Sequence, residues 1–162
     1  MIKFMRNLCN VSKPRDIEME MSTYEDVQPF IPVIKTGKIV KVYDGDTVTV
    51  SARLYITEKQ TTKLFRFNVR LRGIDSPEIK SKNANERILA IEARDGLQSL
   101  IMNQVVTLEN VAYDKYGRIL ADIITKEGVN VSDWMLGNDY AVKYNGGTKH
   151  RPSEWTDISL DS

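Results

Sequence analysis

Apolar and polar positions first alternate in a regular way after residue 36. Alternation with a period of two is typical of strands that bury one face, and here it predicts three strands, over residues 38–43, 47–56 and 63–72. Asp44-Gly45 separates the first two strands and is a turn signal. A polar segment over residues 58–62 separates the second strand from the third.

A helical period replaces the alternation after Pro77, a residue that cannot donate to a strand ladder. Apolar and small residues recur on one arc and predict a helix from about Ala84 to Asn103. Two further strands are predicted over residues 105–112 and 119–124. Asn130 is placed to cap a short helix over residues 131–136.

The order of these elements predicts an α+β fold. Three strands, a long helix, two strands and a short helix suit a five-stranded β-barrel of the OB type, with an open antiparallel sheet covered by helices on one face as the alternative. We expect this domain to span residues 37–147. Residues 1–36 lack a sustained pattern and predict an irregular leader, extended or disordered in part, and residues 148–162 predict a polar C-terminal tail.

Composition excludes several classes of protein. The chain has 162 residues, 41% hydrophobic and 28% charged, and no apolar run long enough to cross a membrane. Cys9 is the only cysteine and His150 the only histidine, which excludes an internal disulfide and a histidine-rich metal site. Residues 1–10 lack the uninterrupted apolar stretch of a secretory signal, so we expect a cytoplasmic or otherwise intracellular location. We also expect a monomer with no membrane partner.

The net charge of +1 hides an uneven distribution along the chain. Residues 35–72 carry nine basic and three acidic side chains, an excess of +6 over the three predicted strands. Such an excess is a candidate surface for phosphates, although a solvated strand face has the same composition.

Five charged residues next to predicted strand ends suggest chemistry. Asp46 and Asp75 could provide oxygen ligands to one calcium ion, and Glu78 could take a proton from water without binding the metal. Arg70 and Arg118 could grip a phosphate and stabilise charge that grows on its oxygens. Metal, base and guanidinium groups are sufficient for phosphodiester hydrolysis.

Each of these segments also has a purely structural interpretation. The segment Asp44–Thr47 could be a hairpin turn in which Asp-Gly adopts positive φ. Asp75–Glu78 could be a plain turn that leads into the helix. Arg70 and Arg118 could be ordinary solvated residues.

Three motifs in series resemble the staphylococcal nuclease (thermonuclease) family. They are Val42-Tyr-Asp-Gly-Asp-Thr-Val48, Val69-Arg-Leu-Arg-Gly-Ile-Asp-Ser-Pro-Glu78 and Asp114-Lys-Tyr-Gly-Arg118, and Tyr140-Ala-Val-Lys-Tyr-Asn-Gly-Gly147 follows them. The resemblance covers about residues 37–147. It implies an OB-type barrel with helices and a calcium-dependent nuclease site.

The resemblance also implies a role for each matching position. Asp46 and Asp75 would be carboxylate ligands of Ca²⁺, and Ser76 would offer its backbone carbonyl. Glu78 would be the general base, and Arg70 and Arg118 would bind phosphate. Two tyrosines, Tyr116 and Tyr144, would line the nucleotide pocket.

The sequence therefore favours a hydrolase, an endonuclease that cleaves DNA and RNA with low sequence specificity. By resemblance, the 5′-oxygen would leave and 3′-phosphate ends would result. Two alternatives stay open: a catalytically silent nuclease-like domain that binds nucleic acid or a protein partner, and a structural OB-type module whose motifs match by chance.

Overall fold

The computed structural model describes residues 14–56, 59–149 and 151–156. Cys9 and His150, on which the exclusions above depend, lie outside these residues. The chain divides into two units, Met1–Phe30 and Ile31–Ser162, and each is described by itself. No helix within the described ranges is long and apolar enough to cross a membrane.

In the described part of the first unit, residues 14–30, there is one helix, α1 (Pro14–Met21). Proline is favoured at the first helical position because its fixed φ suits the helix and its missing N–H is not needed there. The sequence predicted an irregular leader here. Pattern analysis recognises a helix by its buried stripe, and residues 18–21 of α1 are all exposed.

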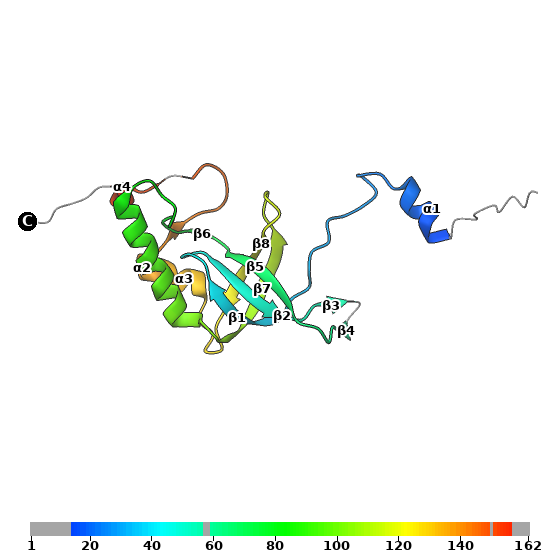
Figure 1. Cartoon of the computed structure of the whole chain (residues 1–162), viewed down its shortest axis with the longest axis horizontal. Helices are drawn as coiled ribbons and strands as arrows, with labels where there is room; N and C mark the ends of the chain where they lie inside the picture. The colour runs from blue at the N-terminus through cyan, green and yellow to red at the C-terminus, as the bar shows by residue number, and fades with distance from the viewer. Residues whose placement is uncertain (1–13, 57–58, 150, 157–162) are drawn as a thin grey trace, which may run out of the picture. The chain divides into compact units, whose positions relative to one another are not determined.

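The second unit is built on five strands that close into a barrel (Figure 1). Its members, in the order in which they pair, are β1 (Thr36–Val42), β2 (Thr47–Ala52), β5 (Phe65–Leu71), β8 (Ile119–Ile124) and β7 (Val105–Tyr113). All pairs are antiparallel except β5 with β8. Closure confirms the OB-type α+β fold and excludes the open sheet.

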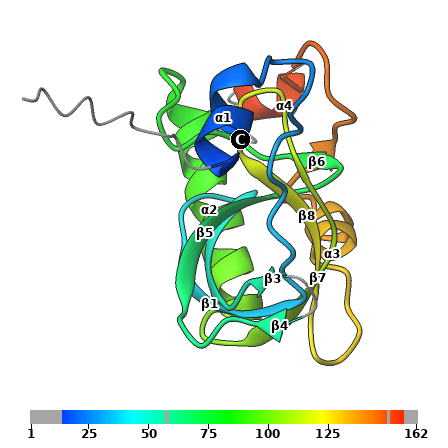
Figure 2. The same ribbon diagram turned by 90° about the vertical axis from the view of Figure 1, so that its right-hand side faces the viewer.

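Helix α2 (Ala84–Ile101) covers one end of the barrel (Figure 2). Its buried side chains include Ala93, Leu97 and Ile101, which belong to the same core as the inward-facing strand residues. Burial of this apolar stripe stabilises the helix in its place. Helix α3 (Val131–Gly137) adds Val131 and Met135 to that core.

Both helices begin where their caps are expected. The Asn83 side chain accepts a hydrogen bond from the Glu86 N–H at the start of α2. The Asn130 side chain accepts one from the Asp133 N–H at the start of α3, as the sequence predicted.

Two pairs of short strands extend the barrel. The pair β3 (Tyr55–Ile56) and β4 (Lys59–Gln60) falls where one long strand and a polar loop were predicted. The pair β6 (Ile74–Asp75) and β9 (Val142–Lys143) joins the segment after β5 to the segment after α3.

The last described segment folds back onto the N-terminal end of α2 (Figure 1). It contains the short helix α4 (Ser153–Thr156), in which Trp155 is buried. The side-chain amides of Asn83 and Asn85 donate to backbone carbonyls of this segment. This part of the predicted polar tail packs through Trp155, while Arg151, Ser153 and Glu154 are exposed.

Candidate functional site

The turn between β1 and β2 places Asp46 beside the loop that follows β6. Gly45 at its centre has no positive φ; a Cβ built there would lie 2.8 Å from the Ser76 Cβ and 2.9 Å from the Ala93 Cβ. The hairpin-turn interpretation therefore gave the wrong reason for this glycine. Only glycine lets the turn approach the Ser76 loop and α2 this closely.

Asp46 and Asp75 meet at a single guanidinium. Arg70 Nη1 lies 2.7 Å from Asp46 Oδ2, and Nη2 lies 2.6 Å from Asp75 Oδ1. All three residues are at most 7% exposed. The structure thus contradicts the interpretation of Arg70 as a solvated strand residue.

The charge of Asp46 is only partly compensated. Burial raises the pKa of its carboxyl to about 7, although Arg70 and a hydrogen bond from Thr47 oppose the shift. The charges of Asp44 and Asp75 add to the rise. A buried carboxylate whose negative charge is only partly compensated favours the binding of a further cation.

The loop after β6 fixes Ser76 and Glu78 next to this cluster. The Ser76 N–H lies 3.4 Å from Asp46 Oδ2, and Ser76 is buried. The Glu78 N–H donates to Glu86 Oε1 at 3.2 Å. Glu86 is fully buried at the start of α2, and it also accepts a hydrogen bond from Ser81 Oγ.

The Glu78 carboxylate is half exposed and contacts Lys149. Lys149 Nζ lies 2.9 Å from Glu78 Oε1 and 2.9 Å from Asp75 Oδ1. The hydrogen bond from this ammonium holds the pKa of Glu78 below its ordinary value. Arg151, two residues farther on, has its Nε 3.3 Å from Glu86 Oε1. The segment after β9 therefore contacts the loop at Glu78 and the start of α2 at Glu86.

Arg118 is positioned by the turn between β7 and β8. The Asp114 side chain accepts hydrogen bonds from the N–H groups of Tyr116 and Arg118, and its Oδ2 lies 2.7 Å from Arg118 Nε. Asp114 thereby orients the guanidinium through its Nε. The side chain is 45% exposed and lines the same hollow as Asp46 and Glu78.

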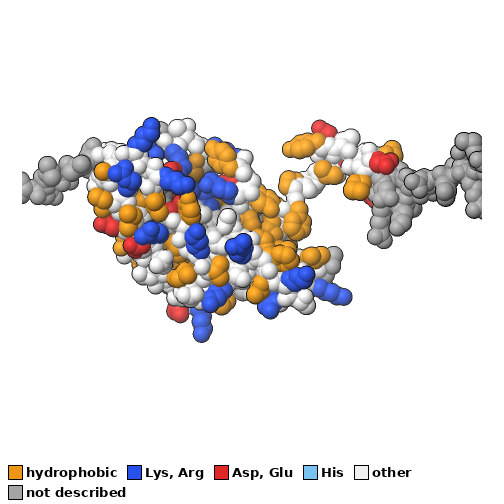
Figure 3. Space-filling view, viewed as in Figure 1, with side chains coloured by type: hydrophobic (Ala, Val, Ile, Leu, Met, Phe, Trp, Pro, Cys, Tyr) orange, Lys and Arg blue, Asp and Glu red, His pale blue; other side chains and the backbone are white. Residues whose placement is uncertain are grey.

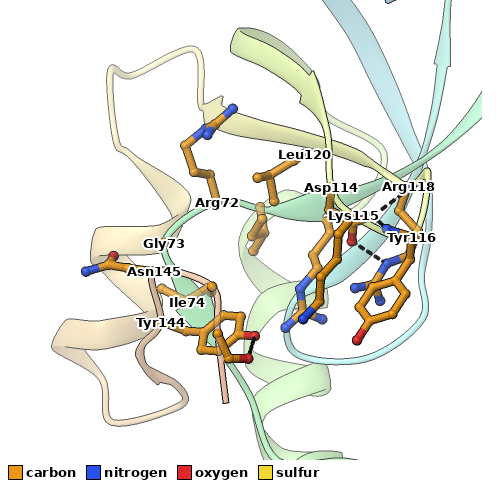
Figure 4. Close-up of a pocket in the computed structure, with 14 residues that line it drawn as sticks. Arg72, Gly73, Ile74, Asp114, Lys115, Tyr116, Arg118, Leu120, Tyr144 and Asn145 are labelled. Atoms are coloured by element: carbon orange, nitrogen blue, oxygen red, sulfur yellow. Dashed lines mark hydrogen bonds and ion pairs between the residues drawn. The ribbon is translucent and has the colours of Figure 1, made fainter. Parts of the chain in front are cut away.

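Two hollows share this site. One, of about 550 Å³, is lined by Asp46, Glu78 and Lys149 among others. The other, of about 440 Å³, is lined by Tyr116 and Tyr144 (Figure 4). Arg70 and Arg118 line both hollows, so a phosphate bound between these arginines would have space for a nucleoside beside it.

The two tyrosines reach the second hollow from different segments. Tyr116 lies on the turn after β7 and is 72% exposed, and the Arg118 guanidinium lies 5.4 Å from the centre of its ring. Tyr144 follows β9, and its hydroxyl donates to the Gly147 carbonyl. An exposed aromatic ring beside an arginine is a suitable platform for a base.

The donor set fits a calcium ion better than a transition metal. Within the described part of the chain, no cluster of three or more His, Cys, Asp and Glu side chains could hold a metal. Asp46 and Asp75 offer hard oxygen atoms, and Arg70 only partly offsets the charge of Asp46. Calcium accepts carbonyls, waters and substrate oxygens to complete its shell, so two carboxylates are a sufficient protein contribution.

The structure thus brings together the site residues that the sequence singled out. All of them line one or both of two adjoining hollows except Asp75, which joins them through its ion pair with Arg70. The sequence analysis missed Asp114, Glu86 and Lys149. Asp114 was named only as the first residue of the third motif, with no role of its own. Lys149 lies 71 positions from Glu78, and no local pattern connects the two.

Comparison with known proteins places this arrangement in a family. The model of the family described as "Staphylococcal nuclease homologue" matches residues 68–157. The chain belongs to the staphylococcal nuclease family. The match extends past the predicted domain end to α4 and includes Arg70, Glu78, Arg118 and Lys149. Asp46 lies before it and is placed by its motif and by its contact with Arg70.

Curated members of the staphylococcal nuclease family are moderately similar. An uncharacterized endonuclease of Escherichia coli is 32% identical over 100 residues, covering 62% of this chain and 55% of that protein. The thermonuclease of Staphylococcus hyicus is 35% identical over 89 residues, covering 54% and 47%. The chain spans about half the length of these relatives.

Proposed function

We propose that the protein is a calcium-dependent nuclease that hydrolyses phosphodiester bonds of DNA and RNA with low sequence specificity. One observation carries the proposal. Two buried carboxylates share one guanidinium, and an exposed carboxylate and a second guanidinium lie over the same hollow. Membership of the staphylococcal nuclease family and the names of its relatives support this reaction class.

Asp46, Asp75 and the Ser76 carbonyl would hold the calcium ion. When bound, calcium supplies positive charge against the phosphate oxygens and organises water near the phosphorus. Calcium needs six to eight oxygen ligands, so most of its shell must come from water and substrate. Metal and nucleic acid should therefore strengthen each other's binding.

Glu78 would accept a proton from the attacking water. Its carboxylate lines the hollow next to the two aspartates, and its backbone is fixed by the hydrogen bond to Glu86. The hydrogen bond from Lys149 favours the ionised form, which is the form that a general base requires.

Arg118 and Arg70 would bind the phosphate that is cleaved. The Arg118 guanidinium is held through Nε by Asp114, so its outer N–H groups can meet two phosphate oxygens. Arg70 already contacts both aspartates and must share its donors with the substrate. Contacts to phosphate carry no base information, which accounts for low sequence specificity.

Incubation with labelled single-stranded and double-stranded DNA and RNA tests the proposal. We expect cleavage with calcium, none in excess chelator, and little or none with magnesium, which prefers a tight octahedral shell. Products should carry 3′-phosphate ends. Full activity in chelator would contradict the metal mechanism, and no cleavage of any of the substrates with calcium would favour a silent binding domain.

A further inference from the structure

The outer face of β1, β2 and β5 carries the charge excess that the candidate site leaves unused. Outward positions of the three strands pair in rows: Lys38 with Ser51 and Arg66, Lys41 with Thr49 and Asn68, and Thr47 with Arg70. None of the three strands contains Asp or Glu. Figure 3, in the view of Figure 1, shows Lys and Arg side chains spread over this face.

The rows continue the candidate site in one direction along β5. Arg72 lines the tyrosine hollow, Arg70 lines both hollows, and Asn68 lines only the hollow that contains Glu78. Arg66 comes next on the same face of the strand. Alternate residues of β5 and of the turn that follows it thus form a line. This line runs from the hollow with the two tyrosines, past the phosphate proposed to be cleaved, to the exposed row of Lys38 and Arg66.

The outermost row consists of Lys38, Ser51 and Arg66. Lys38 and Arg66 are exposed, and neither has an ion pair with any residue in the described ranges. They lie on the two strands that flank β2, so they stand about 10 Å apart on either side of Ser51. Two unpaired cations beside hydroxyl groups are suited to a chain of phosphates.

We propose that this face binds the continuation of a single-stranded polynucleotide that extends from the cleavage site. This inference rests on the proposed function, because it takes the phosphate between Arg70 and Arg118 as its starting point. A base in the tyrosine hollow is out of a duplex stack, and a basic strand face that leads away from this hollow suits the backbone of an unpaired strand. Their phosphates would pass Lys41 first and then lie between Lys38 and Arg66.

The geometry sets the length of substrate at which the effect begins. Arg66 is four residues from Arg70 along a strand, which corresponds to about 13 Å. A stacked strand rises about 3.4 Å per nucleotide, so about four nucleotides cover this distance. Stacked oligonucleotides of three residues therefore end before the outermost row, and those of twelve pass over it.

Fluorescence anisotropy with labelled dT3 and dT12, in chelator so that neither is cleaved, tests the proposal. We expect wild type to bind dT12 more tightly than dT3. Lys38→Glu with Arg66→Glu should weaken dT12 binding by about tenfold and lower its salt slope by about 1.4, the loss of two phosphate contacts on a single strand. Binding of dT3 should change less than about twofold.

Matched variants separate this surface from general charge. Arg94→Glu with Lys126→Glu makes the same change of net charge on α2 and on the turn after β8, and it should leave dT12 binding within about twofold. Lys38→Gln with Arg66→Gln should give a weaker form of the same loss. Thermal melting of every variant shows that each is folded.

Several results would overturn the proposal. They are equal affinity of wild type for dT3 and dT12, an equal loss for both in the Lys38/Arg66 variants, and an equal loss of dT12 binding in the control pair. Displacement of dT12 by polyglutamate at the concentration at which unlabelled dT12 acts would indicate an acidic protein partner instead. Failure of wild type to cleave with calcium would contradict the proposed function alone, because the binding measurements decide the strand face separately.

Discussion

The candidate site has two halves that differ in how the fold holds them. The inner group consists of Arg70 and Asp75 on strands β5 and β6 and Asp46 in the tight turn between β1 and β2, and it is 2–7% exposed. The outer group, Glu78, Arg118 and Lys149, comes from loops, and its side chains are 41–49% exposed. Buried charges depend on their partners for stability, whereas exposed ones do not. The inner group should therefore serve both stability and activity, and the outer group activity alone.

The largest effect is expected from Arg70→Met. It leaves two buried carboxylates without their shared partner, which should cost about 3–5 kcal/mol of the free energy of unfolding and abolish cleavage. Arg70→Lys keeps the positive charge but lacks the two-pronged guanidinium that contacts both aspartates. Its free energy of unfolding should therefore lie between those of wild type and Arg70→Met. Urea denaturation measures the difference. A fully stable Arg70→Met protein would show that the inner group has no structural role.

Arg118→Lys should reduce cleavage by about a hundredfold without changing stability. Lysine keeps the charge but cannot hold two phosphate oxygens and the Asp114 carboxylate together. Cleavage rates at saturating calcium and substrate, with melting curves beside them, test this. Arg53→Lys, on an exposed residue after β2, is the control and should be silent. Equal rates for both variants would remove Arg118 from the site.

Gly45→Ala tests how the inner group is assembled. The new Cβ would meet the Ser76 and Ala93 Cβ atoms, which belong to short side chains that cannot move aside, so we expect a loss of about 1–3 kcal/mol. Cleavage should fall as Asp46 moves away from Ser76. Gly137→Ala is the control, because nothing lies within 4 Å of its Cβ. Similar melting temperatures for both variants would contradict the close approach.

The smallest effect is expected from Lys149→Met. An exposed ion pair contributes at most about 1 kcal/mol, so stability should change little and cleavage should fall about fivefold or less. Lys149→Arg should restore part of the loss, because it can still contact Glu78. Steady-state kinetics of wild type, Lys149→Met and Lys149→Arg measure the change in cleavage rate. A rise in activity would show instead that the ammonium competes with calcium for the carboxylates.

The barrel was predictable because each of its strands buries one face. Residues 119–124 were placed without error, and α2 was placed to within two residues. Elements without such a face were missed: α1 is exposed where described, and β6 and β9 are two residues long. The turn at Gly45 was located correctly but explained wrongly, because a steric reason for glycine arises only when Ser76 and α2 pack on it.

The site was predictable to the extent that its residues lie in short motifs. Arg70, Asp75 and Glu78 are close in sequence, so a single motif indicated them together. Lys149 and Arg151 reach the site only because Trp155 and α4 pack against the start of α2. Contacts of that kind depend on tertiary packing, which leaves no period in the sequence.

Single-turnover cleavage by Glu78→Gln tests the central claim most directly. The amide keeps the size of the side chain and removes the base, so the rate should fall by about two orders of magnitude or more. Binding of calcium and of oligonucleotide, measured by calorimetry on the same protein, should stay within a fewfold of wild type. A variant that keeps more than half of the wild-type rate would contradict the assignment of Glu78 and, with it, the proposed chemistry of the site.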